Sequence, residues 1–156
     1  MDDSGTGPVD LATFLTAHGF AAVPLQVNAV GHFECEAHVN GQPARLLLDT
    51  GASHTVLATP SAERLGLRTT PSAERAHGVG ASHHATETAV LDELRLGAVR
   101  LRDVAVWTFD LSHVNHALAA RGGAPVDGAL GGDVLRPAEA VIDYARATLY
   151  LRPARA

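Results

Sequence analysis

One acidic side chain lies in a sequence context that could support acid–base chemistry. Asp49 directly follows Leu46–Leu48, an apolar run typical of a strand buried on both faces. Burying a carboxylate is costly because its charge loses hydration, so an acid at the end of such a run suggests a function. Gly51, Ala52 and Ser53 follow, and glycine permits a tight turn or the close approach of another backbone. The spacing predicts a carboxylate in a tight loop that faces a cleft, and an ordinary Asx turn after a strand fits the same residues.

The elements expected to carry this loop are strands. Residues 33–39 alternate between apolar and polar side chains, which is typical of a strand with one buried face. The predicted buried face holds Phe33, Cys35, Ala37 and Val39, and the other face holds His32, Glu34, Glu36 and His38. Asn40-Gly41 then predicts a type I′ hairpin, whose return strand brings Asp49 to the end of the sheet.

The rest of the sequence favours further strands and a few short helices. Helices are expected where apolar residues recur at helical spacing or where capping residues and glycine bound a segment, at 8–19, 59–66 (with Thr59 as N-cap) and 110–122. Strands are expected at 23–27, 86–91, 93–96 and 99–107, and a closing hairpin at 140–144 and 148–151. We therefore expect an all-β fold in the broad sense, mainly β with a few short helices.

Two stretches of the sequence resemble the retropepsin-like aspartic proteases. The first is similar to the active-site loop of that family and runs Leu47-Leu48-Asp49-Thr50-Gly51-Ala52-Ser53, with Thr55-Val56-Leu57 after it. The second is similar to the family's other signature, two hydrophobic residues and a glycine followed by a polar residue and a short helix. It runs Ala129-Leu130-Gly131-Gly132-Asp133. Gly132 departs from the long side chain, often arginine, that is usual at its position.

The resemblance covers roughly residues 23 to 151 and implies the closed barrel of an acid protease, with one lobe per chain. It divides the chain into an N-terminal extension with a short helix, residues 1–22, and a protease domain, residues 23–156. It implies that Asp49 is catalytic, that Thr50 braces two such loops across a two-fold axis, and that Gly51 allows their close approach. The segment 129–133 would pack behind the loop and support it.

A glycine-spaced stretch between two strand-like segments is a candidate flap. It consists of His77, Gly78, Val79 and Gly80. The resemblance implies a hairpin here that closes over an extended peptide and excludes water, and two glycines around one valine would give its tip the necessary freedom. A plain loop fits the stretch as well, and a Gly-x-Gly this short is too weak to predict a phosphate site.

The number of acidic motifs implies an assembly. Two carboxylates about 3 Å apart share one proton, so that one activates a water as a base while the other acts as an acid on the scissile carbonyl. The sequence contains one Asp-Thr-Gly motif. The other candidate acids do not belong to a second copy of this motif: Asp110, Asp127, Asp133 and Asp143. The expected enzyme is therefore an aspartic endopeptidase that works as a homodimer, in which Asp49 meets its own copy.

The expected substrate is an extended peptide, and no cofactor is expected. Such a peptide would bind as an added strand, with Ala52, Val79 and residues 106–109 as candidate pocket residues. Ala52 has no hydroxyl to donate to an ionised aspartate, so we expect the pair of acids to titrate at higher pH than a pair with serine at that position.

The amino-acid composition limits the number of domains, the partners and the location that can be expected. The 156 residues are 46% hydrophobic and 19% charged, which suits one globular domain. A net charge of −5 without a basic stripe argues against nucleic acid as a partner. The polar, acidic start and the lack of long apolar runs lead us to expect no membrane contact and a cytoplasmic location.

Three alternatives compete with this interpretation, and the sequence supports them unequally. His83-His84, or His113 with His116, could ligate zinc, but no His-Glu-x-x-His motif accompanies them and the one cysteine supplies no thiolate set. A Ser-His-Asp hydrolase would need a Gly-x-Ser-x-Gly elbow, which the sequence lacks. The main rival is a noncatalytic module of the same fold that binds peptides or dimerises.

Overall fold

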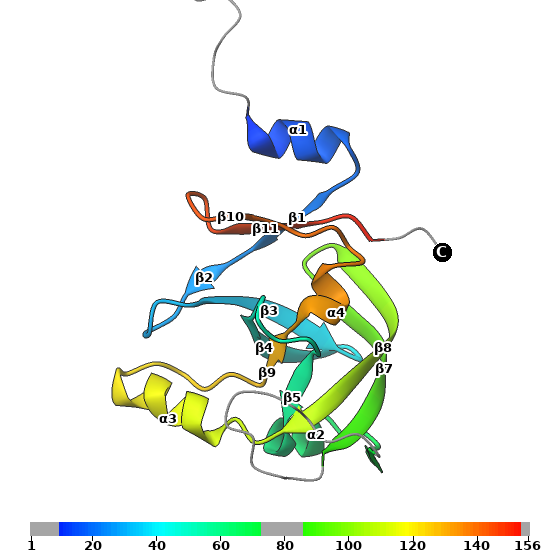
Figure 1. The fold of residues 1–156 in the computed structure, drawn as a ribbon, viewed down its shortest axis with the longest axis vertical. Helices are drawn as coiled ribbons and strands as arrows, with labels where there is room; N and C mark the ends of the chain where they lie inside the picture. The colour runs from blue at the N-terminus through cyan, green and yellow to red at the C-terminus, as the bar shows by residue number, and fades with distance from the viewer. Residues whose placement is uncertain (1–9, 73–85, 154–156) are drawn as a thin grey trace, which may run out of the picture.

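A computed structural model describes residues 10–72 and 86–153 of the chain (Figure 1). The helices are α1 (Leu11–Ala17), α2 (Thr59–Arg64), α3 (Ser112–Ala120) and α4 (Gly132–Leu135). The strands of the first half are β1 (Ala21–Pro24), β2 (Gln26–Val27), β3 (Phe33–Val39), β4 (Gln42–Leu48), β5 (Val56–Ala58) and β6 (Thr70–Pro71). Those of the second half are β7 (Glu87–Leu96), β8 (Val99–Phe109), β9 (Gly128–Leu130), β10 (Val141–Asp143) and β11 (Thr148–Leu151). The predicted mainly β fold is confirmed.

The larger sheet closes on itself. Its strand order is β2-β3-β4-β9-β5-β8-β7-β6, and an additional antiparallel pairing joins β3 to β7, with His38 opposite Arg95 and Val39 opposite Leu94. Strands β3, β4, β9, β5, β8 and β7 therefore form a ring. Closure removes free edges from these strands, and the predicted closed barrel is confirmed.

Aliphatic side chains fill the barrel. Cys35, Ala37 and Val39 of β3 are at most 1% exposed, as the alternation predicted. Glu34 differs from its prediction, because it is only 2% exposed although it lies on the opposite face. It sits in the middle of three strands, between Gln26 and Leu47, and its carboxylate pairs with Arg45 at 3.4 Å.

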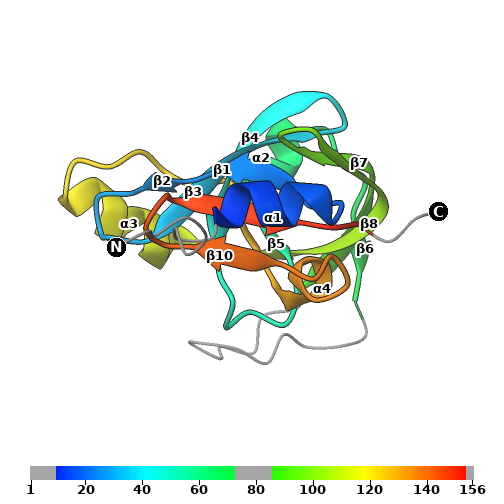
Figure 2. The same cartoon turned by 90° about the horizontal axis from the view of Figure 1, so that it is seen from above.

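The second sheet has three strands in the order β1-β11-β10, and α1 lies over it (Figures 1 and 2). Asp10 caps α1 by accepting hydrogen bonds from the Ala12 N–H (3.1 Å) and the Thr13 hydroxyl (2.7 Å). The strand expected at 23–27 is divided between the two sheets. The division falls at Leu25, whose N–H donates to the carbonyl of Ala147.

The predicted turn between β3 and β4 is confirmed, whereas the predicted start of α2 is not. Asn40 and Gly41 both have positive φ, 49° and 84°, as the type I′ prediction requires. The predicted N-cap of α2 is wrong by one residue: Ala58, not Thr59, precedes the helix, and no side chain caps it. The Ala58 N–H donates to the Asp127 carbonyl at 2.7 Å, which keeps Ala58 extended and makes Thr59 the first helical residue.

Candidate active site

Asp49 lies directly after β4 and is held through its backbone. Its N–H donates to the carbonyl of Leu130 at 3.0 Å, and its carbonyl accepts the Ala52 N–H at 3.2 Å. Its carboxylate oxygen Oδ1 accepts the N–H of Gly51 at 3.0 Å, which is the Asx interaction considered above. The side chain is partly exposed, so the carboxylate of Asp49 is anchored by one backbone donor and remains accessible.

Strand β9 passes between the two strands that flank the loop. It pairs in parallel with β4, placing Leu130 opposite Leu48, and antiparallel with β5, placing Ala129 opposite Val56. A Cβ atom on Gly128 would lie 2.2 Å from the carbonyl oxygen of Val56. Glycine is therefore required there, because no side chain fits between the strands.

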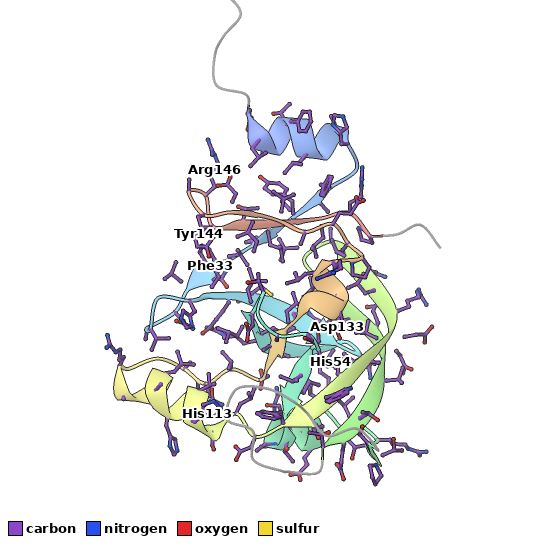
Figure 3. All side chains as sticks on the ribbon, viewed as in Figure 1. Phe33, His54, His113, Asp133, Tyr144 and Arg146 are labelled. Carbon is purple, nitrogen blue, oxygen red and sulfur yellow. The ribbon has the colours of Figure 1, made fainter. Side chains whose placement is uncertain are left out.

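The start of α4 is bonded to the far end of the loop. The carboxylate of Asp133 accepts the Thr55 N–H at 2.9 Å and the Thr55 hydroxyl at 2.7 Å. The same hydroxyl oxygen accepts the Gly131 N–H at 3.0 Å, and the Gly132 N–H donates to the carbonyl of Ala52 at 2.7 Å. Asp133 and His54 are neighbours in Figure 3. The two stretches that carried the resemblance, residues 47–53 and 129–133, thus meet in space.

The loop between these anchors faces solvent. Thr50, Gly51, Ser53 and His54 are exposed, and Ala52 is partly buried. The His54 ring stacks on Trp107 of β8, with ring centroids 4.3 Å apart and an angle of 10° between the planes. The sequence did not predict this stack, since no local pattern links a residue of the loop to one on β8.

Asp127 is a further anchor that the sequence did not reveal. Its carboxylate accepts the Arg45 N–H at 2.8 Å, the Ser61 hydroxyl at 2.8 Å and the Arg64 guanidinium at 2.9 Å. Burial alone would raise the pKa of Asp127, but these three donors outweigh it and hold the pKa below its usual value. Asp127 thereby fixes the start of β9 to β4 and α2.

Other predicted site residues are placed differently or not described. His77, Gly78, Val79 and Gly80 of the candidate flap lie outside the described residues, as do His83 and His84. Val106 is 0% exposed, which rules it out as a pocket residue, whereas Trp107 is partly exposed. Within residues 10–72 and 86–153, no three His, Cys, Asp or Glu side chains are grouped so that they could hold a metal ion. In the same ranges no helix has the length and apolar character to cross a membrane.

Comparison with solved structures shows that the fold is shared. A retropepsin-like aspartic protease from Rickettsia conorii is similar with a TM-score of 0.59 and 21% identity, over 86% of this chain and 92% of that one. The retroviral protease-like domain of Ddi1 from Leishmania major is similar with a TM-score of 0.51 and 16% identity, over 81% and 90% of the two chains. The arrangement is therefore the retropepsin-like fold.

Sequence comparison identifies the family. A 57-residue stretch is 44% identical to an uncharacterised protein from the cobV 5′ region of a Sinorhizobium species, and it covers 36% of this chain and 24% of that relative. The matched stretch thus spans about a quarter of the length of the curated relative. The aspartyl protease family matches residues 35–134, which include both Asp49 and Asp133 and make up more than half of the chain. The chain belongs to the aspartyl protease family.

Proposed function

We propose that this protein is an aspartic endopeptidase whose active site forms between two copies of the chain. The observation that carries the proposal is the placement of Asp49, a partly exposed carboxylate in the strand-end loop of a protein of this family. Thr50 and Gly51 are exposed beside it, where a second copy could reach them. In the proposed dimer Thr50 braces the paired loops and Gly51 lets their backbones approach.

The need for a second copy rests on the contacts that the carboxylates of the other candidate acids already make. Asp127 is held by Arg45, Ser61 and Arg64. The carboxylate of Asp133 accepts hydrogen bonds from the N–H and the hydroxyl of Thr55. Asp143 accepts the backbone N–H of Arg146 at 3.1 Å and pairs with its guanidinium at 3.5 Å. Asp110 accepts the backbone N–H of Ser112 at 2.9 Å. These four acids serve the structure, so the partner carboxylate is assigned to Asp49 of the other copy.

The chemistry follows from two acids that share one proton. Two carboxylates a few ångströms apart cannot both ionise easily, so one is charged and one is neutral. The charged Asp49 removes a proton from a water molecule, which attacks the peptide carbonyl carbon, while the neutral Asp49 donates its proton to the carbonyl oxygen. Collapse of the tetrahedral intermediate breaks the C–N bond, and a proton passes to the leaving amine. Anchoring by Gly51 and Leu130 holds each carboxylate in place through this exchange.

The peptide would bind as an extended strand under the candidate flap. Main-chain hydrogen bonds would hold it, and alternate side chains would meet pockets on either side. We assign the flap to residues 77–80 because the family resemblance implies a flap hairpin there and two glycines surround one valine. We assign Ala52 to the nearest pocket, together with Trp107 and its stacked partner His54, because these side chains are partly or fully exposed.

The decisive experiment compares Asp49→Asn with the wild type on a mixture of synthetic peptides, with products identified by mass spectrometry. Loss of all cleavage is expected, because asparagine cannot act as the base or share the proton. Asp92→Asn is the matched control, since Asp92 is exposed on β7. Both variants should unfold at the wild-type temperature. A wild type that binds peptides without cutting them would instead support the noncatalytic module.

A further inference from the structure

A row of basic side chains crosses the outer face of the barrel near the turn between β7 and β8. Arg95 of β7 lies directly opposite Arg100 of β8, and His38 of β3 lies directly opposite Arg95 on its other side. Neighbouring side chains of a strand face opposite sides. Val39 and Leu94 are 0% exposed and face the core, so the row faces outward. We call His38, Arg95 and Arg100 the basic row; all three are partly or fully exposed.

The arginines of the basic row have no acidic partner among the described residues. In residues 10–72 and 86–153 the ion pairs are made by other arginines: Arg45, Arg64, Arg146 and Arg152. Glu93, two positions before Arg95 on the same face of β7, lies opposite Arg102. Glu36, two positions before His38 on β3, lies opposite Arg45. The nearby acids therefore face other arginines, and the charge of the basic row is left uncompensated.

Two arginines directly opposite each other are an unfavourable choice for the fold. Opposed side chains of an antiparallel pair have Cβ atoms about 4.5–5.5 Å apart, and like charges at that distance destabilise the sheet. Packing does not require a charge at either position, because Arg95 and Arg100 both lie on the outer face. Residues that break a local rule of stability are expected mainly at functional sites. The pair therefore indicates a ligand that supplies negative charge.

The dimensions of the basic row suit carboxylates on an extended peptide. A planar guanidinium group can bind a carboxylate through two parallel hydrogen bonds, and the imidazole of His38 can donate one more. Adjacent strands lie about 4.8 Å apart, so the row is about 10 Å long from β3 to β8. Side chains on one side of an extended peptide recur about every 6.8 Å. Two acids at alternate positions of a peptide therefore fit within the row.

The net charge of the chain limits how long the negatively charged ligand can be. The chain carries a net charge of −5, so the molecule as a whole repels a long polyanion such as a nucleic acid. Charges on its surface act on one another over roughly 8–10 Å at physiological salt, which is about the length of the basic row. The ligand that fits is therefore a short acidic peptide segment rather than a nucleic acid.

The basic row lies well away from the candidate active site. His38 is paired with Pro43 near the start of β4, whereas Asp49 comes six positions later, after the end of that strand. At about 3.3 Å per residue this is a separation of about 20 Å along β4. Figures 1 and 2 also place β7 and β8 on the opposite side of the barrel from α3. A segment bound at the row leaves the Asp49 loop free.

We propose that the basic row binds a short acidic segment of the protein substrate, with acids at alternate positions, at a distance from the bond that is cut. The inference rests on the proposed function, which identifies the bound protein as a substrate. A stretch of at least about six extended residues joins the acidic segment to the cleaved bond. Binding at the row raises the effective concentration of the cleaved segment at Asp49. The acidic segment therefore lowers KM and leaves kcat unchanged.

Binding is measured first, on chains that also carry Asp49→Asn so that no peptide is cut. The probe is a fluorescein-labelled peptide of the pattern Glu-Gly-Glu-Gly-Glu, followed by fluorescence anisotropy, and its glutamine version is the control. Replacing both Arg95→Gln and Arg100→Gln should weaken binding about tenfold, since two exposed ion pairs are lost. Raising the salt concentration from about 50 mM to about 300 mM should also weaken it.

The matched control variant carries Arg68→Gln and Arg121→Gln. Both residues are exposed and outside the basic row, so the net charge changes equally while the row stays intact. This variant should bind the acidic peptide as the unaltered row does. Arg100→Gln alone should unfold at the wild-type temperature or above it, because it removes a like charge from the cross-strand pair. Thermal unfolding therefore separates lost binding from lost structure.

Cleavage is then compared for two substrates that share one cleaved sequence, taken from the peptide mixture described above. Each carries, after a flexible linker of roughly ten residues, either the acidic segment or its glutamine version. In the wild type the acidic segment should lower KM about tenfold at unchanged kcat. The chain with Arg95→Gln and Arg100→Gln should lose this advantage and cleave the glutamine version as the wild type does.

The outcomes that overturn the inference differ from those that overturn the proposed function. Equal binding of the acidic peptide with and without the two arginines, or tighter binding of a single-stranded oligonucleotide, would refute the acidic docking site, and peptide cleavage would be untouched. Binding that needs both arginines in a protein that cuts no peptide would refute the proposed function. The site would then bind acidic segments, and the assignment of the bound protein as a substrate would fall.

Discussion

Thr55 donates both its N–H and its hydroxyl to the carboxylate of Asp133, although 78 positions separate the two residues. The hydroxyl oxygen of Thr55 also accepts the N–H of Gly131. A single side chain therefore ties the loop that carries Asp49 to the first turn of α4. Displacement of either segment would move the other.

The first prediction concerns this threonine. Thr55→Val keeps the shape but leaves the Gly131 N–H without its acceptor, so the free energy of unfolding should fall by about 1–3 kcal/mol. Thr55→Ser keeps the hydroxyl and should restore most of the loss. Urea unfolding of both variants, with Thr70→Val on exposed β6 as a control, measures the effect. Equal stability of Thr55→Val and the wild type would refute the anchoring role.

Two neighbouring glycines should respond differently to the same change. A Cβ on Gly131 would lie 2.7 Å from the carbonyl oxygen of His54, whereas a Cβ on Gly132 would meet no atom closer than the Ala52 oxygen at 3.5 Å. Gly131→Ala should therefore cost about 1–3 kcal/mol through overpacking, and Gly132→Ala should be nearly neutral. Thermal unfolding of the pair tests this, and similar losses for both would contradict the close approach.

Ala52 should influence the pH dependence of the proposed peptide cleavage. In Ala52→Ser a hydroxyl becomes available to donate to the ionised Asp49, which favours the charged form and lowers the pKa of the acid pair. The acidic limb of the kcat/KM profile should move to lower pH. Ala52→Thr supplies the same donor and should move it likewise. A profile that stays in place in both variants would exclude the effect.

Mixing wild-type and Asp49→Asn chains should reveal whether two copies share one site. If each site needs two Asp49 carboxylates, activity after subunit exchange follows the square of the wild-type fraction. An equal mixture at fixed total protein then retains about one quarter of the activity. A mixture of wild type with Asp92→Asn, which keeps Asp49 and changes an exposed residue of β7, serves as the control. Activity in direct proportion to the wild-type fraction would show that one chain suffices.

Asp127 should make stability depend on pH. Its pKa is depressed in the folded protein, so its contribution is complete above the unfolded pKa of about 3.8 and is lost as pH falls through the folded value. The stability difference between wild type and Asp127→Asn should therefore be largest near neutral pH and shrink below about pH 4. Urea unfolding from pH 3 to pH 7 measures it. A constant Asp127→Asn difference over this range would contradict the linkage.

The sequence predicted those parts of the fold that local chemistry decides. Asn40-Gly41 specified the hairpin that feeds β4, and alternation placed Cys35 and Val39 in the core. The apolar run before Asp49 correctly located the strand-end loop. A family resemblance, rather than local pattern, brought residues 129–133 to the same site.

Long-range contacts account for what the sequence did not predict. The burial of Glu34 depends on Arg45 from the next strand, and the carboxylate of Asp127 gathers donors up to 82 positions away. The His54–Trp107 stack joins a loop to a strand that follows it by some fifty residues. Such partners leave no periodic trace in the sequence, since each depends on which strands become neighbours.

The passage of β9 between β4 and β5 has a consequence for biosynthesis. The two strands around Asp49 are neighbours in sequence, yet each is hydrogen-bonded to a strand that is made some eighty residues later. Contacts of such sequence separation form late and slowly. A nascent chain on the ribosome therefore carries Asp49 before its loop has the backbone partners seen in the fold, and the proposed activity can arise only after β9 has emerged.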